Sequence, residues 1–64
     1  MDETDKKIIN FMKKTGTPVP TSEIILVSQL SWGSTNRHLN WLRLQGLITR
    51  KVIKNIFHWE LVKG

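Results

Sequence analysis

Hydrophobic residues recur along the chain with two different spacings, and the change of spacing divides it into helices and a hairpin. Between positions 8 and 12, four apolar residues lie at helical spacing, which predicts a first helix over residues 5–15. Thr4 is expected to cap its start, and Gly16 to end it. The two prolines in residues 17–20 exclude helix and predict a linker or a very short edge strand.

Two more helices are predicted after this linker. Thr21 or Ser22 provides the start signal for a short helix over residues 23–29. Its β-branched content would also suit a strand, but the start signal favours helix. Ser31 is expected to cap a longer third helix over residues 32–45, and the glycine that follows is expected to stop it.

The last third of the chain changes to the alternating pattern of β-strands. Residues 47–53 and 56–62 are predicted to form two strands joined by a turn at Lys54 and Asn55. With the helices, they predict an α+β fold in which three helices are followed by a two-stranded β-hairpin. The alternating residues expected to face the core are Phe57, Trp59 and Leu61.

The composition limits what such a domain can do. A chain of 64 residues predicts a single domain over residues 1–64, too small to build both a core and a substrate pocket, so no enzyme activity is expected. It has no cysteine and only two histidines, so neither a metal site nor a cofactor is expected. No apolar run is long enough to span a membrane, and the acidic start is not a targeting peptide. The predicted location is the cytoplasm.

The excess positive charge lies entirely in the second half of the chain. Residues 1–32 hold four lysines and four acidic residues, whereas residues 33–64 hold six cationic residues and one glutamate. The isoelectric point is about 10.1. One-sided basic charge is typical of nucleic-acid binding, although basic charge can also serve solubility alone.

The third helix has one apolar and one basic face when its residues are placed about 100° apart. The apolar face carries Thr35, His38, Leu39, Leu42 and Gln45, with Trp32 and Trp41 on its flanks. The other face carries Gly33, Asn36, Arg37, Asn40, Arg43 and Leu44. A solvated helix face usually includes acidic residues for pairing along the helix, and this face has none. Its composition suits a major groove, where asparagine can bond adenine and arginine can bond guanine.

Residues 21–48 carry a more specific pattern, which resembles the winged helix-turn-helix family of transcriptional regulators. The residues that carry it are Leu30-Ser31, the segment 34–42 and Gly46-Leu47-Ile48. Ser28 departs from the family pattern, which usually has a larger apolar residue there, and Gly33 weakens the start of the third helix. The resemblance implies a winged helix-turn-helix fold, with the hairpin as its wing and double-stranded DNA as its partner.

The candidate DNA contacts fall into three groups. Asn36, Arg37, Asn40 and Arg43 are the expected base-reading residues of the third helix. Ser31 and Ser34 at its start suit phosphate contacts, together with the backbone N–H groups there. By the family resemblance, the wing residues Arg50, Lys51, Lys54 and Asn55 would touch the DNA backbone or the minor groove. A basic hairpin could equally protect an exposed strand edge from aggregation.

The tryptophans and histidines are expected to differ in role. Trp59 is expected in the core and Trp41 against the first helix, whereas Trp32 could touch a sugar or a thymine methyl group. His38 and His58 are expected to be structural or to contact phosphate, not to be catalytic.

A second resemblance concerns winged helices that bind left-handed duplex. These place an asparagine in the third helix, a tyrosine four residues later, a tryptophan in the last strand and paired prolines in the wing. Asn36 and Trp59 fit this pattern, but Asn40 occupies the tyrosine position and the wing has no proline.

Three classes of function stay open at this stage. The first is a sequence-specific transcriptional regulator, and the second is a non-specific or replication-associated DNA-binding domain. The third is a winged-helix module that binds proteins. The sequence also leaves open whether the domain acts as a monomer or as a homodimer. Candidate dimer surfaces are the first helix, with Phe11 and Met12, or the apolar residues Leu26 and Leu44.

Overall fold

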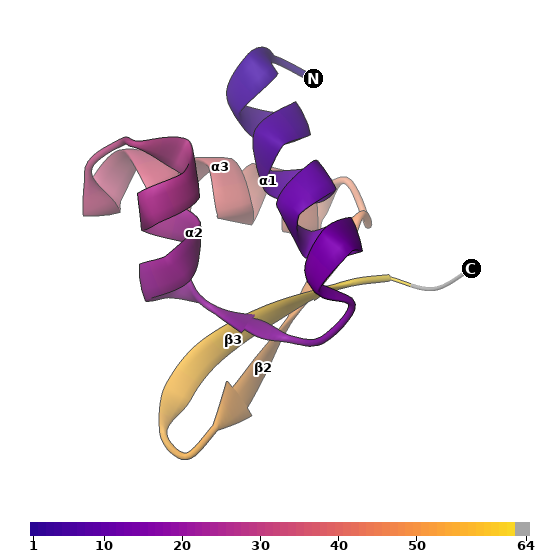
Figure 1. Ribbon diagram of the computed structural model, residues 1–64. Coiled ribbons are helices and arrows are strands. Elements are labelled where there is room, and N and C mark those ends of the chain that lie inside the picture. The colour runs from indigo at the N-terminus through magenta and orange to yellow at the C-terminus, as the bar shows by residue number, and fades with distance from the viewer. Residues whose placement is uncertain (63–64) are drawn as a thin grey trace.

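The computed structural model describes residues 1–62, which form three helices and a small antiparallel sheet (Figure 1). The elements in chain order are α1 (Glu3–Thr15), β1 (Val19–Pro20), α2 (Thr21–Ser28), α3 (Trp32–Leu44), β2 (Ile48–Ile53) and β3 (Ile56–Leu61). The predicted fold class is confirmed. Lys63, one of the cations counted above, lies outside the described residues. None of these helices is long and apolar enough to cross a membrane.

The sheet contains the predicted hairpin and also the short strand before α2. Its strand order is β1–β3–β2, with both neighbouring pairs antiparallel. Val19 pairs with Trp59, so the linker after α1 is tied to the middle of β3. Lys54 and Asn55 form the predicted turn, with left-handed φ angles of 51° and 63° that match the two-residue hairpin turn. The hairpin of β2, β3 and this turn is the wing.

The start of α1 differs from the prediction. Asp2, and not Thr4, is the N-cap, and the helix begins at Glu3. The Asp2 carboxylate accepts a hydrogen bond from the Asp5 N–H at 2.9 Å, and the Asp5 carboxylate accepts one from the Asp2 N–H at 3.2 Å. This reciprocal capping box satisfies two N–H groups that a helix start otherwise leaves open. The helix ends as predicted at Gly16, which has a φ of 71°.

The prediction that Thr21 or Ser22 caps α2 is also wrong. Pro20 is the N-cap residue, and no side chain caps the helix. Thr21 is 4% exposed and turns its hydroxyl inward, where it accepts a hydrogen bond from Trp59 Nε1 at 2.8 Å. The same hydroxyl lies 3.5 Å from the Phe57 carbonyl oxygen. Thr21 therefore joins α2 to β3 and is not available as a cap.

The core contains at least one apolar residue from each of the six elements. Its buried members are Ile8, Met12, Val19, Ile24, Leu39, Leu42, Ile48 and Trp59. Trp59 is the largest fully buried side chain and lies between the sheet and the helices, as predicted. Phe57, predicted to face the core with it, is 49% exposed. The wing extends beyond the helical layer (Figure 1), and the starts of α2 and α3 border Phe57 without burying it.

Candidate nucleic-acid interface

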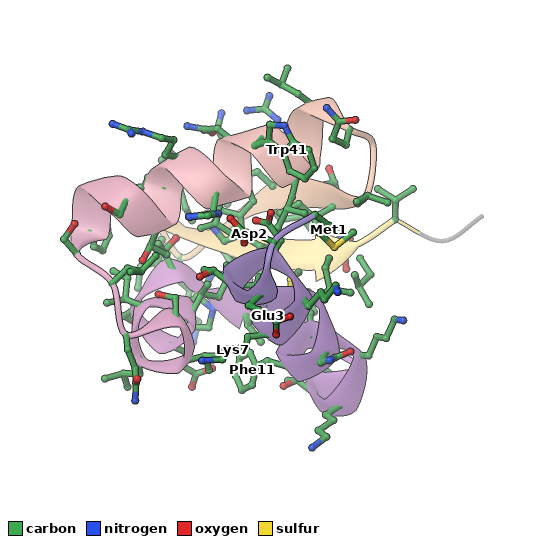
Figure 2. All side chains as sticks on the ribbon, turned by 90° about the horizontal axis from the view of Figure 1, so that it is seen from above. Met1, Asp2, Glu3, Lys7, Phe11 and Trp41 are labelled. Carbon is green, nitrogen blue, oxygen red and sulfur yellow. The ribbon has the colours of Figure 1, made fainter. Side chains whose placement is uncertain are left out.

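The surface of α3 exposes the basic and amide side chains predicted for DNA contact. Arg37, Asn40 and Arg43 are exposed, whereas Asn36 and Ser34 are half-buried. No acidic residue occurs in α3. Viewed from above in Figure 2, α3 lies along one side of the molecule, with nitrogen-bearing side chains pointing away from the other helices. The helix thus presents hydrogen-bond donors to solvent without an acidic partner of its own.

Ser31 begins α3 in the predicted way. Its hydroxyl oxygen accepts a hydrogen bond from the Ser34 N–H at 3.3 Å, which makes it the N-cap. The Ser31 hydroxyl also lies 3.2 Å from the Ser34 hydroxyl. Both serines are therefore at the helix start, where backbone N–H groups and the helix dipole favour an anion.

The opposite face of α3 is held by a buried hydroxyl pair. Thr35 is fully buried, and its hydroxyl lies 2.9 Å from the hydroxyl of Ser28 in α2. Ser28 also bonds the Ile25 carbonyl oxygen and accepts from the Leu30 N–H in the turn between the helices. The serine that departs from the family pattern thus joins α2, the turn and α3. Gln45, predicted on the buried face, is exposed because it lies just past the last turn of α3.

His38 joins the middle of α3 to the start of α1. Its Nδ1 atom is hydrogen-bonded to Asp5 Oδ1 at 2.8 Å and lies 3.9 Å from Asp2 Oδ2. This contact confirms a structural role for His38. Asp2, Asp5 and His38 each offer one possible metal-ligand atom, and these three atoms lie within 4.8 Å of one another. Both carboxylates already accept hydrogen bonds in the capping box. The hydrogen bond from the Asp5 N–H also holds the pKa of Asp2 below its usual value of 3.8.

Trp41 and Trp32 lie on the two flanks of α3. Trp41 is 40% exposed and stands over Met1 and Asp2 at the start of α1 (Figure 2). It therefore lies beside the start of α1 while leaving part of the indole in solvent. Trp32, in the first turn of α3, is 59% exposed. Trp32 is thus accessible to a ligand.

The wing does not gather its four predicted DNA contacts into one cluster. Successive strand residues point to opposite faces, so Arg50 and Lys51 are separated by the sheet. The Arg50 guanidinium lies over the Phe57 ring, 4.6 Å from its centroid. Lys51 Nζ lies 2.8 Å from Glu60 Oε1 on the other face. The remaining two, Lys54 and Asn55, are exposed at the turn.

Two side-chain pairings, Lys51–Glu60 in the wing and Asp5–His38 between α1 and α3, could not be found from the sequence alone. Lys51 and Glu60 belong to different strands, and their contact depends on the register that pairs Thr49 with Glu60. The Asp5–His38 bond joins residues 33 positions apart. Neither pairing follows from spacing within a single helix or strand.

Three helices with a capped, acid-free third helix and a basic hairpin define a helix-turn-helix protein with a wing. Comparison with known families agrees with this class. The chain belongs to the family described as winged helix-turn-helix DNA-binding, whose model matches residues 1–49. It is therefore a DNA-binding domain. No curated protein matches the chain.

Two solved structures share this fold. The Zalpha domain from Carassius auratus PKZ, solved in complex with Z-DNA, is 25% identical, with 94% of each chain covered and a TM-score of 0.79. A mutant of Lactococcus lactis ZitR is 18% identical, with a TM-score of 0.85. That match covers 98% of this chain but 44% of the ZitR chain, so this chain spans less than half of that structure.

Proposed function

We propose that the domain is a transcriptional regulator that reads duplex DNA with α3 in the major groove and rests its wing on the DNA backbone. The observation that carries this proposal is the exposed, acid-free face of a helix whose opposite face is fixed by hydrogen bonds to α1 and α2. A rigid helix can hold its side chains at constant positions relative to base edges, which sequence discrimination requires.

The chemistry of this face supports base reading. Arg37 and Arg43 can each bond the O6 and N7 atoms of a guanine, and Asn40 can bond the N6 and N7 atoms of an adenine. Asn36 lies one turn before Asn40 on the same side of the helix. In the proposed complex, the hydroxyl groups of Ser31 and Ser34 and the backbone N–H groups at the start of α3 contact a phosphate. These contacts fix the helix in the groove, and the amide and guanidinium groups then select the bases.

The wing adds cations outside the recognition helix. Lys54 and Asn55 at its exposed turn are proposed to contact phosphates. Arg50 and Lys51 belong to the same proposed surface, but each is engaged within the wing, with Phe57 and with Glu60 respectively. We therefore propose that Lys54 makes the strongest wing contact.

Selection of bound duplexes from a random pool tests the proposal. An enriched motif is expected, and Arg37→Ala and Asn40→Ala should each lose about 1–3 kcal/mol of discrimination at one base position. The matched control is Lys7→Ala, because Lys7 lies on α1 away from α3 (Figure 2) and its loss removes one charge without touching the proposed interface. A flat selection would favour non-specific binding, and no binding at low salt would leave the protein-binding class.

The likeness to a domain solved with Z-DNA supports one second candidate, binding of left-handed duplex. Asn36 and Trp59 match the resemblance described above, whereas Asn40 stands where those domains have tyrosine. Trp59 is also buried and bonded to Thr21, so its indole is not free to contact DNA. Circular dichroism of an alternating cytosine–guanine duplex distinguishes the candidates, because only left-handed binding inverts the spectrum as protein is added.

A further inference from the structure

A hollow of about 250 Å³ lies where the start of α2, the start of α3 and the tip of the wing meet. Its lining contains no charged side chain. The residues that line it are Thr21, Ser22, Trp32, Asn55, Ile56 and Phe57.

Three of the six residues that line this hollow are large apolar residues left open to solvent. Trp32 is 59% exposed, Ile56 is 54% exposed and Phe57 is 49% exposed. Single exposed apolar residues are common on protein surfaces, but a contiguous group of them marks an interaction site. Here the two aromatic residues Trp32 and Phe57 line a single hollow, which indicates an occupant with a flat apolar surface.

The position of the hollow indicates what that occupant is. Trp32 lies one helical turn before Asn36, at the beginning of the proposed base-reading face. Asn55 and Ile56 belong to the wing tip, next to Lys54. DNA that contacts both α3 and the wing must therefore pass over the hollow.

The surrounding charge fits the same occupant. The Arg50 guanidinium lies over the Phe57 ring, and Lys54 extends from the adjacent turn. Cations at the rim and aromatic rings inside suit a ligand that joins a flat ring to an anionic backbone. A nucleotide has this construction.

We propose that the hollow binds one unpaired nucleobase of DNA, held against Trp32 and Phe57 with its phosphate beside Lys54. Neighbouring bases cover both faces of a base inside a duplex, so only a base outside the stack can present a face to the rings. The domain should therefore prefer a duplex that carries an extra unpaired base over a perfect duplex. This inference rests on the proposed DNA interface and adds a preference for DNA structure to its reading of sequence.

Three duplexes that share one sequence test the proposal. The first is fully paired, the second carries one extra unpaired adenine, and the third carries an abasic nucleotide at the extra position. The abasic duplex keeps the additional phosphate and the distorted backbone but lacks the ring. Dissociation constants are measured by fluorescence anisotropy for the wild type, Trp32→Ala and the control Trp41→Ala, which removes another exposed tryptophan of α3.

The wild type should bind the adenine bulge more tightly than the abasic bulge by roughly 5- to 150-fold, the range for stacking of one base on an aromatic side chain. Trp32→Ala should remove this difference between the two bulged duplexes, whereas Trp41→Ala should preserve it. With 2-aminopurine as the extra base, its fluorescence should change on addition of the wild type and not of Trp32→Ala. Because Trp32 is exposed, the variant should unfold at the same temperature as the wild type.

Equal affinity of the wild type for the two bulges overturns the proposal, and so does a difference that persists in Trp32→Ala. A shift of the protein alone from dimer to monomer in Trp32→Ala, without any effect on bulged DNA, would assign the hollow to a second copy of the chain. Failure of the proposed function gives a different result. In that case the random-pool selection is flat and Arg37→Ala loses no discrimination, while the adenine and abasic bulges can still be compared.

Discussion

Replacing Lys54 by alanine should make DNA binding less sensitive to salt, and replacing Lys51 should change that sensitivity much less. The two lysines are three residues apart in the wing, and the sequence alone gives no reason to separate them. The structure distinguishes the two lysines, because Lys51 Nζ lies 2.8 Å from Glu60 Oε1. Among residues 1–62, Lys54 takes part in no ion pair. Its charge is therefore the one available to a phosphate.

The expected magnitude follows from counterion release. Each phosphate contact contributes about 0.9 to the slope of log affinity against log salt for right-handed duplex. Lys54→Ala should therefore make the slope shallower by about 0.9. The loss for Lys51→Ala should be well below that value, because Glu60 already compensates its charge. Glu60→Gln should free Lys51 and steepen the slope by up to about 0.9.

Anisotropy titrations over a several-fold range of salt, with one fixed duplex, measure these slopes for the wild type and the three variants. The Lys51–Glu60 pair is partly exposed, with side-chain exposures of 53% and 28%, so its own contribution to stability is small and all variants should stay folded. Equal losses for Lys51→Ala and Lys54→Ala would show that DNA displaces Glu60 from Lys51. An unchanged slope in every variant would refute the placement of the wing on the backbone.

Three further predictions concern the contacts that position α3 and the sheet. Trp59→Ala should lower the free energy of unfolding by about 3–5 kcal/mol and leave no cooperative thermal transition. Trp59→Phe keeps an aromatic ring in the core, although it loses part of the buried volume and the hydrogen bond to Thr21, and should still melt cooperatively. Ser28→Ala should lower the free energy of unfolding, measured with urea, by about 1–3 kcal/mol because the buried Thr35 hydroxyl loses its partner. The double variant with Thr35→Val should recover part of this loss, because it removes the unpaired hydroxyl. The folded-state pKa of Asp2 lies below 3.8, so its stabilising contribution is present above that pH and is lost as the pH falls through the folded value. Asp2→Asn keeps a capping oxygen, and its urea midpoint should therefore fall less than that of the wild type on acidification.

The ends of most elements could be predicted because their signals are local. Gly16 and Gly46 have left-handed φ angles of 71° and 77°, a conformation that glycine adopts without strain, and both stand just past a helix. Ser31 caps α3 through a residue three positions later. Each of these signals lies within about one helical turn, so the sequence displays it directly.

Contacts between distant positions carry no such signal and explain the errors. Threonine is a common helix-capping residue, and Thr21 stands at the start of α2. Its hydroxyl instead accepts a hydrogen bond from Trp59, 38 residues later, and this contact decides its role. The alternation in β3 correctly placed Trp59 in the core, yet it also predicted Phe57 there. Alternation gives the face of a sheet on which a residue lies, and only the tertiary arrangement decides whether a helix covers that face.

The rotation of α3 about its own axis shows why these distant contacts matter for function. Apolar packing of Leu39 and Leu42 is non-directional and would tolerate some turning of the helix. The Thr35–Ser28 and His38–Asp5 bonds are directional, and they fix α3 at two points, one turn apart, to two different helices. Because adjacent helix positions are about 100° apart, these bonds determine which side chains of α3 reach solvent. The amide and guanidinium groups proposed to read bases thus owe their orientation to polar contacts on the opposite side of the same helix.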